Sequence, residues 1–108
     1  MSEQSEILHL HGPLTIKTIT NVRDILQVYL QEAALRNRTL VVDVDGAEEI
    51  DLTLPQLLLS AWQTANRAGV TIALSKPADG NFLTVLQRAG LLHGDRQKDS
   101  FWLEGKAA

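Results

Sequence analysis

The chain has 108 residues, a net charge of −3 and no cysteine. This length suits one domain over residues 1–108, and a hydrophobic fraction of 44% is enough for a modest core. Without cysteine, disulfides, thiol catalysis and thiolate metal sites are excluded. Lysine and arginine form no cluster, which argues against nucleic acid or an anionic membrane as partner.

The first residues of the chain are polar and acidic. Residues 1–6 contain two glutamates and no apolar run, which is not the pattern of a signal peptide. No apolar stretch approaches the length of a membrane span. We therefore expect a cytoplasmic protein without direct membrane insertion. Residues 1–5 and 105–108 are expected to fray.

A short hairpin and a helix are the first predicted elements. Residues 7–11 alternate partly between apolar and polar and stop at a Gly-Pro turn signal, so residues 14–16 can return as a second short strand. From residue 20 or 21 to about residue 38, apolar side chains recur at three- and four-residue spacings. This periodicity predicts an amphipathic helix.

Strands and helices alternate through the rest of the chain. Residues 40–44 are an apolar, β-branched run of the kind buried on both faces of a parallel sheet. A helix is predicted over residues 54–68, a strand over 70–74 and a third helix from about 79 to 89. Residues 100–103 are apolar and are predicted as a last short strand or turn. The alternation predicts an α/β sheet with right-handed crossovers.

The segment that opens the second predicted helix carries a capping-box pattern. Thr53 offers a hydroxyl at the N-cap and Gln56 lies three residues later, while Pro55 falls in the first turn, where its missing N–H is tolerated. A plain cap of this kind stabilises a helix by about 1 kcal/mol. A phosphate on Thr53 would instead face unpaired backbone N–H groups, beside the carboxylate of Asp51. The two roles of Thr53, helix cap and phosphoacceptor, are not exclusive.

One flank of the same helix lies off its apolar stripe. At about 100° per residue, Pro55, Leu59 and Trp62 fall on this flank, and Leu59 is expected to be partly exposed. Either a neighbouring helix covers Leu59 and Trp62, or the two side chains form a docking surface beside Thr53.

Histidines and aspartates give no strong sign of a metal site. His9 and His11 share a strand face, but no third ligand is evident, so solvated histidines are favoured. Asp43, Asp45 and Asp51 suit Mg²⁺ at strand ends, but we favour loop ordering through hydrogen bonds for Asp43 and the start of a turn with Gly46 for Asp45. No Gly-rich phosphate loop and no acid–base set is present, so we expect neither an enzyme nor a cofactor.

Four segments, in order and spacing, resemble the STAS domain, the fold of bacterial anti-sigma factor antagonists. They are Val41-Val42-Asp43, then Ile50-Asp51-Leu52-Thr53, the leucine-rich residues 57–61, and residues 86–91 with their Ala-Gly-Leu turn. The resemblance covers nearly the whole chain. It implies an α/β fold in which a small mixed β-sheet of about four strands is flanked by three to four helices.

This resemblance implies a regulatory module that binds another protein. In the family, a partner serine kinase that is also the anti-sigma factor phosphorylates a hydroxyl in this segment, and the phosphorylated form releases the partner. Thr53 falls on the acceptor position and Asp51 on the acidic position before it. Asp51, Leu54, Leu59 and Trp62 are the predicted partner-binding residues.

The acceptor segment also departs from the family pattern. Leu52 occupies the first hydroxyl position, Leu54 replaces the glycine after the acceptor, and Pro55 follows. STAS modules also serve as non-phosphorylated adaptors in chemotaxis-linked signalling and as small subunits of lipid-transport complexes. The alternative expectation is therefore a constitutive adaptor in a larger complex, in which Thr53 only caps the helix.

Overall fold

The computed structural model describes residues 5–92 and 96–103. These residues form seven elements in the order β1 (Ser5–Leu10), α1 (Ile19–Arg36), β2 (Thr39–Val44), α2 (Thr53–Ala68), β3 (Ile72–Leu74), α3 (Gly80–Arg88) and α4 (Arg96–Leu103). The predicted α/β class is confirmed. The expected fraying of residues 105–108 lies outside the described residues, whereas Ser5, expected to fray, pairs with Thr39 in the sheet.

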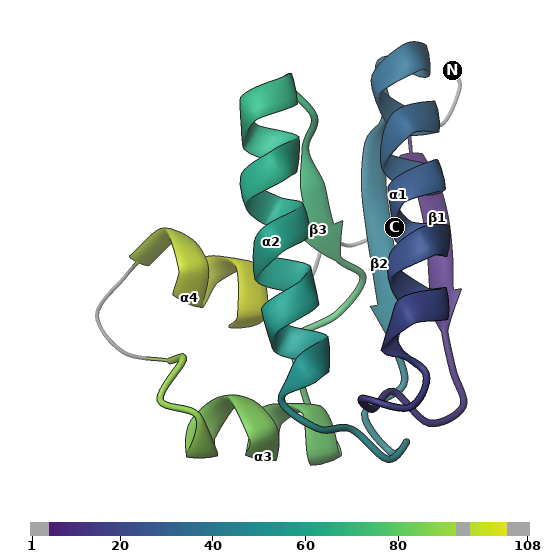
Figure 1. The fold of residues 1–108 in the computed structure, drawn as a ribbon. Coiled ribbons are helices and arrows are strands. Elements are labelled where there is room, and N and C mark those ends of the chain that lie inside the picture. The colour runs from purple at the N-terminus through teal and green to yellow at the C-terminus, as the bar shows by residue number, and fades with distance from the viewer. Residues whose placement is uncertain (1–4, 93–95, 104–108) are drawn as a thin grey trace.

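Three parallel strands form the sheet, in the order β1-β2-β3. Helices α1 and α2 lie side by side over one face of this sheet (Figure 1). Both helices begin at the edge where the strands end, and α3 lies at the same edge. This arrangement follows from right-handed crossovers, which return each helix across the same face of a sheet whose strands follow in sequence order.

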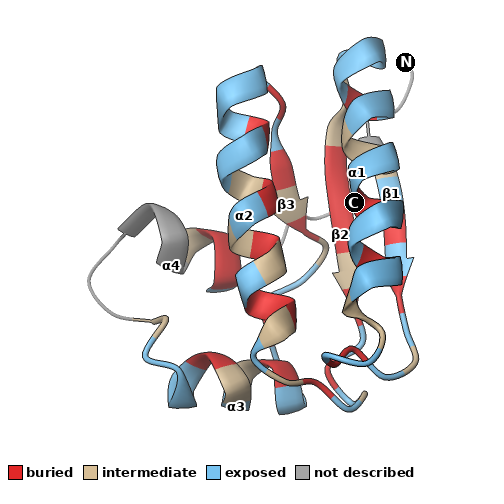
Figure 2. Ribbon diagram, in the orientation of Figure 1, coloured by how far each residue is buried: buried red, intermediate tan, exposed pale blue. Residues whose placement is uncertain are grey.

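The core lies between the sheet and these two helices (Figure 2). Alternate residues of the strands supply its floor, since successive side chains of a strand point to opposite faces. The helices cover them with apolar stripes. Buried core residues include Leu8, Leu10, Leu40, Val42, Val44, Ile72 and Leu74 from the strands, and Val22, Leu26, Ala33, Leu54, Leu58, Ala61 and Ala65 from the helices.

The N-terminal hairpin prediction is wrong. β1 runs parallel to β2, and the segment after the Gly12 turn does not return beside β1. Instead Leu14 forms an isolated parallel bridge with Ile50. Its N–H donates to the carbonyl of Glu49 at 2.7 Å, and its carbonyl accepts from the N–H of Asp51 at 3.3 Å. The backbone groups that a hairpin would have paired therefore join the loop before α1 to the loop before α2, and the described sheet has three strands rather than about four.

The C-terminal apolar segment is a helix and not the predicted strand or turn. Phe101 and Trp102 are buried at the end of α4. Trp102 packs edge-on against Phe82 with ring centroids 5.8 Å apart, and Phe101 lies 6.3 Å from the ring of Trp62. The carbonyl of Trp102 accepts the N–H of Ala78 at 2.8 Å. These contacts close the edge of the core beside α2 and β3.

Two glycines allow the loop after β2 to touch the start of α3. The carbonyl of Gly46 accepts the N–H of Asn81 at 2.7 Å, and the side chain of Asn81 donates to the carbonyl of Glu48 at 2.9 Å. A Cβ on Gly80 would lie 2.5 Å from the Gly46 carbonyl oxygen, and Gly80 also has φ of +54°. Both features require glycine.

We expect Gly80→Ala to lower the free energy of unfolding by more than Gly69→Ala. Gly69 also has positive φ, at +74°, but a Cβ there meets nothing within 4 Å, so the matched variant isolates the close contact. Backbone strain alone costs about 1–3 kcal/mol at either position. Urea titrations of both variants measure the difference. Equal losses would show that the approach of the two loops is not tight.

Candidate functional site

Asp51 occupies the turn that leads into α2. Its Oδ1 accepts the N–H of Thr53 at 3.0 Å and also the hydroxyl of Thr53. The N-cap position is Leu52, which makes no side-chain cap bond. The predicted capping box is therefore wrong, because the hydroxyl of Thr53 donates backward to Asp51 and does not accept from the next turn. The carboxylate of Asp51 satisfies the orphan N–H of Thr53 instead.

The second oxygen of Asp51 reaches a different loop. Its Oδ2 accepts the N–H of Ile16 at 2.9 Å. Because Leu14 is already bonded to Glu49 and to the Asp51 backbone, the two loops run together for several residues. One carboxylate thus links the segment before α1 with the first turn of α2.

The pKa of Asp51 lies below its ordinary value. Burial works to raise it, but the hydrogen bonds donated by the Thr53 hydroxyl and by the N–H groups of Ile16 and Thr53 outweigh burial and lower it. The carboxylate is therefore ionised at neutral pH. An anion suits the N-terminus of a helix, where the backbone dipoles leave partial positive charge.

Two exposed apolar side chains flank this turn. Ile16 is 66% exposed and Leu52 is 43% exposed. We call the residues Ile16, Asp51, Leu52 and Thr53 the α2 corner. Sequence reasoning missed Ile16, because nothing in the periodicity of residues 14–16 places them beside α2. It treated Leu52 only as a departure from the family pattern, although an apolar residue in a polar turn was a signal.

Other predicted site residues differ in their availability. Leu54 is fully buried in the core, so its side chain cannot be offered to a partner at this surface. Pro55 is buried as well, so neither residue projects from the surface next to Thr53. Thr53 itself is half-buried.

Leu59 and Trp62 are both half-buried and pack against the core. The partial exposure expected for Leu59 is confirmed. Part of the Trp62 ring faces Phe101 of α4, so a neighbouring helix accounts for some of its burial. The remaining exposed part of these side chains lies on α2, about two to two and a half turns beyond Thr53.

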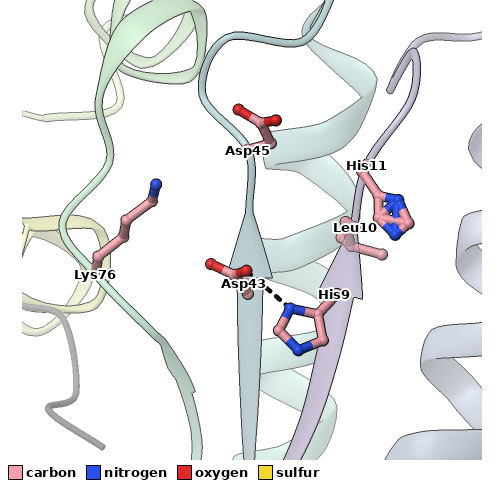
Figure 3. Close-up of a pocket in the computed structure, with 6 residues that line it drawn as sticks. All are labelled: His9, Leu10, His11, Asp43, Asp45 and Lys76. Atoms are coloured by element: carbon pink, nitrogen blue, oxygen red, sulfur yellow. Dashed lines mark hydrogen bonds and ion pairs between the residues drawn. The ribbon is translucent and has the colours of Figure 1, made fainter.

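A second group of polar side chains lies where the strands end. It lines an open hollow of about 500 Å³ formed by His9, Leu10, His11, Asp43, Asp45 and Lys76 (Figure 3). His9 and Asp43 point toward one another from neighbouring strands, with Nδ1 and Oδ2 2.9 Å apart. Since a carboxylate only accepts, Nδ1 of His9 carries the proton. Asp43 also accepts the hydroxyl of Ser75 at 2.7 Å.

The three predicted aspartates are not brought together. Asp43 is bonded to β1 and to the end of β3, Asp45 accepts the N–H of Ala47 at 3.0 Å, and Asp51 belongs to the α2 corner. Within residues 5–92 and 96–103, no three histidine or acidic side chains form a group that could hold a metal ion. In the structure Asp43 joins β1 to the residue after β3, Asp45 holds the turn after β2, and Asp51 joins two loops.

Asp43 and Asp51 should make stability depend on acid pH. Hydrogen bonds from the hydroxyl of Ser75 and, to a smaller extent, from His9 lower the pKa of Asp43 below 3.8, although burial opposes this shift. The groups that donate hydrogen bonds to Asp51 lower the pKa of Asp51 in the same way. A carboxyl group whose pKa is lower in the folded state stabilises the fold at pH values above its unfolded-state pKa. This stabilisation is lost as the pH falls through the folded-state pKa. The stability gap between wild type and an Asp43→Asn, Asp51→Asn variant should therefore narrow below about pH 4. Urea midpoints at pH 7 and pH 3 measure it, and a constant gap would contradict the assignment.

Comparison with models of known protein families identifies the family of this chain. A family model described as "Mlab, STAS domain" matches residues 1–96, which include the α2 corner and the whole sheet. Comparisons with curated proteins and with solved structures gave no match. STAS domains generally mediate protein–protein interactions. Among the residues described, no helix has the length and apolar character needed to cross a membrane. With its small parallel sheet, α1 and α2 on one face and this match over most of its length, the chain belongs to the STAS domain family.

Proposed function

We propose that this protein is a regulatory interaction module of the anti-sigma factor antagonist type and not an enzyme. It binds a protein partner of the serine-kinase, anti-sigma kind in the cytoplasm, through the α2 corner together with the exposed parts of Leu59 and Trp62 farther along α2. The observation that carries the proposal is the exposure of two apolar side chains at the start of α2: Leu52, which precedes Thr53, and Ile16, whose N–H is bonded to Asp51. Apolar side chains near a hydroxyl that a kinase can phosphorylate provide a contact surface and a means of regulating it.

Phosphorylation of Thr53 is the proposed gate. The partner kinase transfers the γ-phosphoryl group of ATP to Oγ1 of Thr53, ADP leaves, and the hydroxyl proton is lost. The product carries close to two negative charges next to the ionised Asp51. A partner surface that fits two apolar side chains then meets a concentrated charge, which costs desolvation on binding. The unmodified protein binds the partner and the phosphorylated protein releases it.

We expect Ile16→Asp and Leu52→Asp each to weaken partner binding by more than tenfold, because each places a charge in an apolar contact. Leu35→Asp is the matched control, since Leu35 is 82% exposed but lies near the C-terminal end of α1, far from the α2 corner. Immobilised wild type and variants would be compared for partner capture from native cells, followed by Kd measurement with the recovered partner. Equal affinities of the corner variants and the control would refute the proposed surface.

A constitutive adaptor is the second candidate. The observation in its favour is the acceptor segment itself, where leucine and proline stand in place of the family's glycine-containing pattern. In that case Leu59 and Trp62 hold an obligate interface within a chemotaxis-linked signalling or lipid-transport complex. Thr53 then only stabilises the first turn of α2 through its hydrogen bonds to Asp51. Thr53→Glu would then leave assembly unchanged, whereas Trp62→Ala would abolish it.

A further inference from the structure

We propose that Asp51 is a positioning residue that couples Thr53 to Ile16, so that modification of Thr53 releases Ile16 from the docking surface. This inference rests on the proposed function for its biological meaning. The coupling itself is a property of the folded chain and can be measured without a partner. It assigns a regulatory mechanism to the α2 corner: the modification removes part of the contact surface in addition to adding charge.

The geometry of the Ile16 loop makes this coupling direct. The N–H of Ile16 donates to Oδ2 of Asp51, and the Ile16 side chain is mostly exposed, so side-chain packing does little to hold it. Its neighbours are fixed by separate bonds. The N–H of Thr15 donates to the hydroxyl of Thr18 at 3.1 Å, and the N–H of Lys17 donates to the hydroxyl of Thr15 at 3.3 Å. Ile16 is thus the residue of this loop whose backbone is bonded to the carboxylate of Asp51.

Both oxygens of the carboxylate are engaged in the unmodified state. Oδ1 holds the hydroxyl and the N–H of Thr53, while Oδ2 holds Ile16. Phosphorylation removes the hydroxyl proton, so one of these bonds is lost. The phosphate oxygens then compete for the N–H groups at the start of α2, and their charge repels the carboxylate. A carboxylate driven toward solvent no longer holds the N–H of Ile16.

Hydrogen exchange of single amides tests this coupling on the isolated protein. We expect the Ile16 amide to exchange at least tenfold faster in Thr53→Glu and in Asp51→Ala than in wild type. Thr53→Gln is the matched control, because it has the size of glutamate without the charge, and its Ile16 amide should stay within threefold of wild type. The Leu14 amide is the internal control, since it donates to the Glu49 carbonyl and should keep its protection in every variant.

Two results would overturn the coupling. One is equal exchange of the Ile16 amide in Thr53→Glu and Thr53→Gln. The other is a parallel rise of the Leu14 and Ile16 amides, which would indicate that the whole corner opens. Failure of the coupling can be distinguished from failure of the proposed function. If Thr53→Glu weakens partner binding while Ile16 stays protected, the coupling is wrong and the function stands. If Ile16 is released but Ile16→Asp leaves partner affinity unchanged, the coupling stands and the function is wrong.

Discussion

Replacing Trp102 with alanine should lower the free energy of unfolding by about 3–5 kcal/mol, the range found when a large core aromatic is truncated. Trp102 is fully buried, packs edge-on against Phe82 and touches Phe101, whose ring centroid lies 5.0 Å away. Its loss would leave a cavity between α3, α4 and the end of β3. Urea unfolding followed by far-UV circular dichroism measures the change.

Trp102→Phe is the matched variant for this site. Among the described residues, no acceptor lies within hydrogen-bonding reach of the buried indole N–H of Trp102, so phenylalanine removes an unsatisfied donor while keeping an aromatic ring against Phe82. We expect it to cost clearly less than Trp102→Ala. A loss below about 1 kcal/mol for Trp102→Ala would contradict the view that α4 closes the core.

Thr53→Glu should weaken partner binding by more than tenfold, or about 1.4 kcal/mol. The added carboxylate would lie beside the ionised Asp51, in the same corner as the exposed side chains of Ile16 and Leu52. The far-UV spectrum should not change, because a negative charge at the start of a helix is tolerated. Kd values for the two proteins and the recovered partner measure the effect.

The control for this prediction is Thr53→Gln, which removes the hydroxyl and enlarges the side chain without adding charge. We expect its affinity to lie much closer to wild type than that of Thr53→Glu. If both variants bind equally weakly, size and not charge limits the interface, and the charge-gating account fails.

Local periodicity predicted the regular elements of the fold well. The apolar run at residues 40–44 lies in β2. The apolar stripe predicted for the second helix lies on α2, which ends at the cap residue Gly69. The errors occurred in segments whose local structure depends on contacts with residues far away in the sequence. Leu14 is apolar, as many strand residues are, but the connection to α1 places it beside Ile50 and not beside β1. Phe101 and Trp102 are apolar enough for a strand, but packing against Trp62 and Phe82 favours a helix.

The α2 corner was predictable only in part. The sequence identified Asp51 and Thr53 as neighbours, because they are two residues apart and open a helix. It could not reveal Ile16, which is 35 residues away from Asp51 and donates its backbone N–H to the Asp51 carboxylate. It also could not place Leu52 outward, because the direction of that side chain depends on how the first turn of α2 meets the core.

The modification state of Thr53 in native cells decides whether this residue gates a partner surface. Peptide mass spectrometry of the protein isolated under several growth conditions would measure it. We predict a phosphate localised to Thr53 in a fraction of the molecules that varies with conditions. Thr53 unmodified under every condition would contradict the gate and leave the constitutive adaptor as the better description.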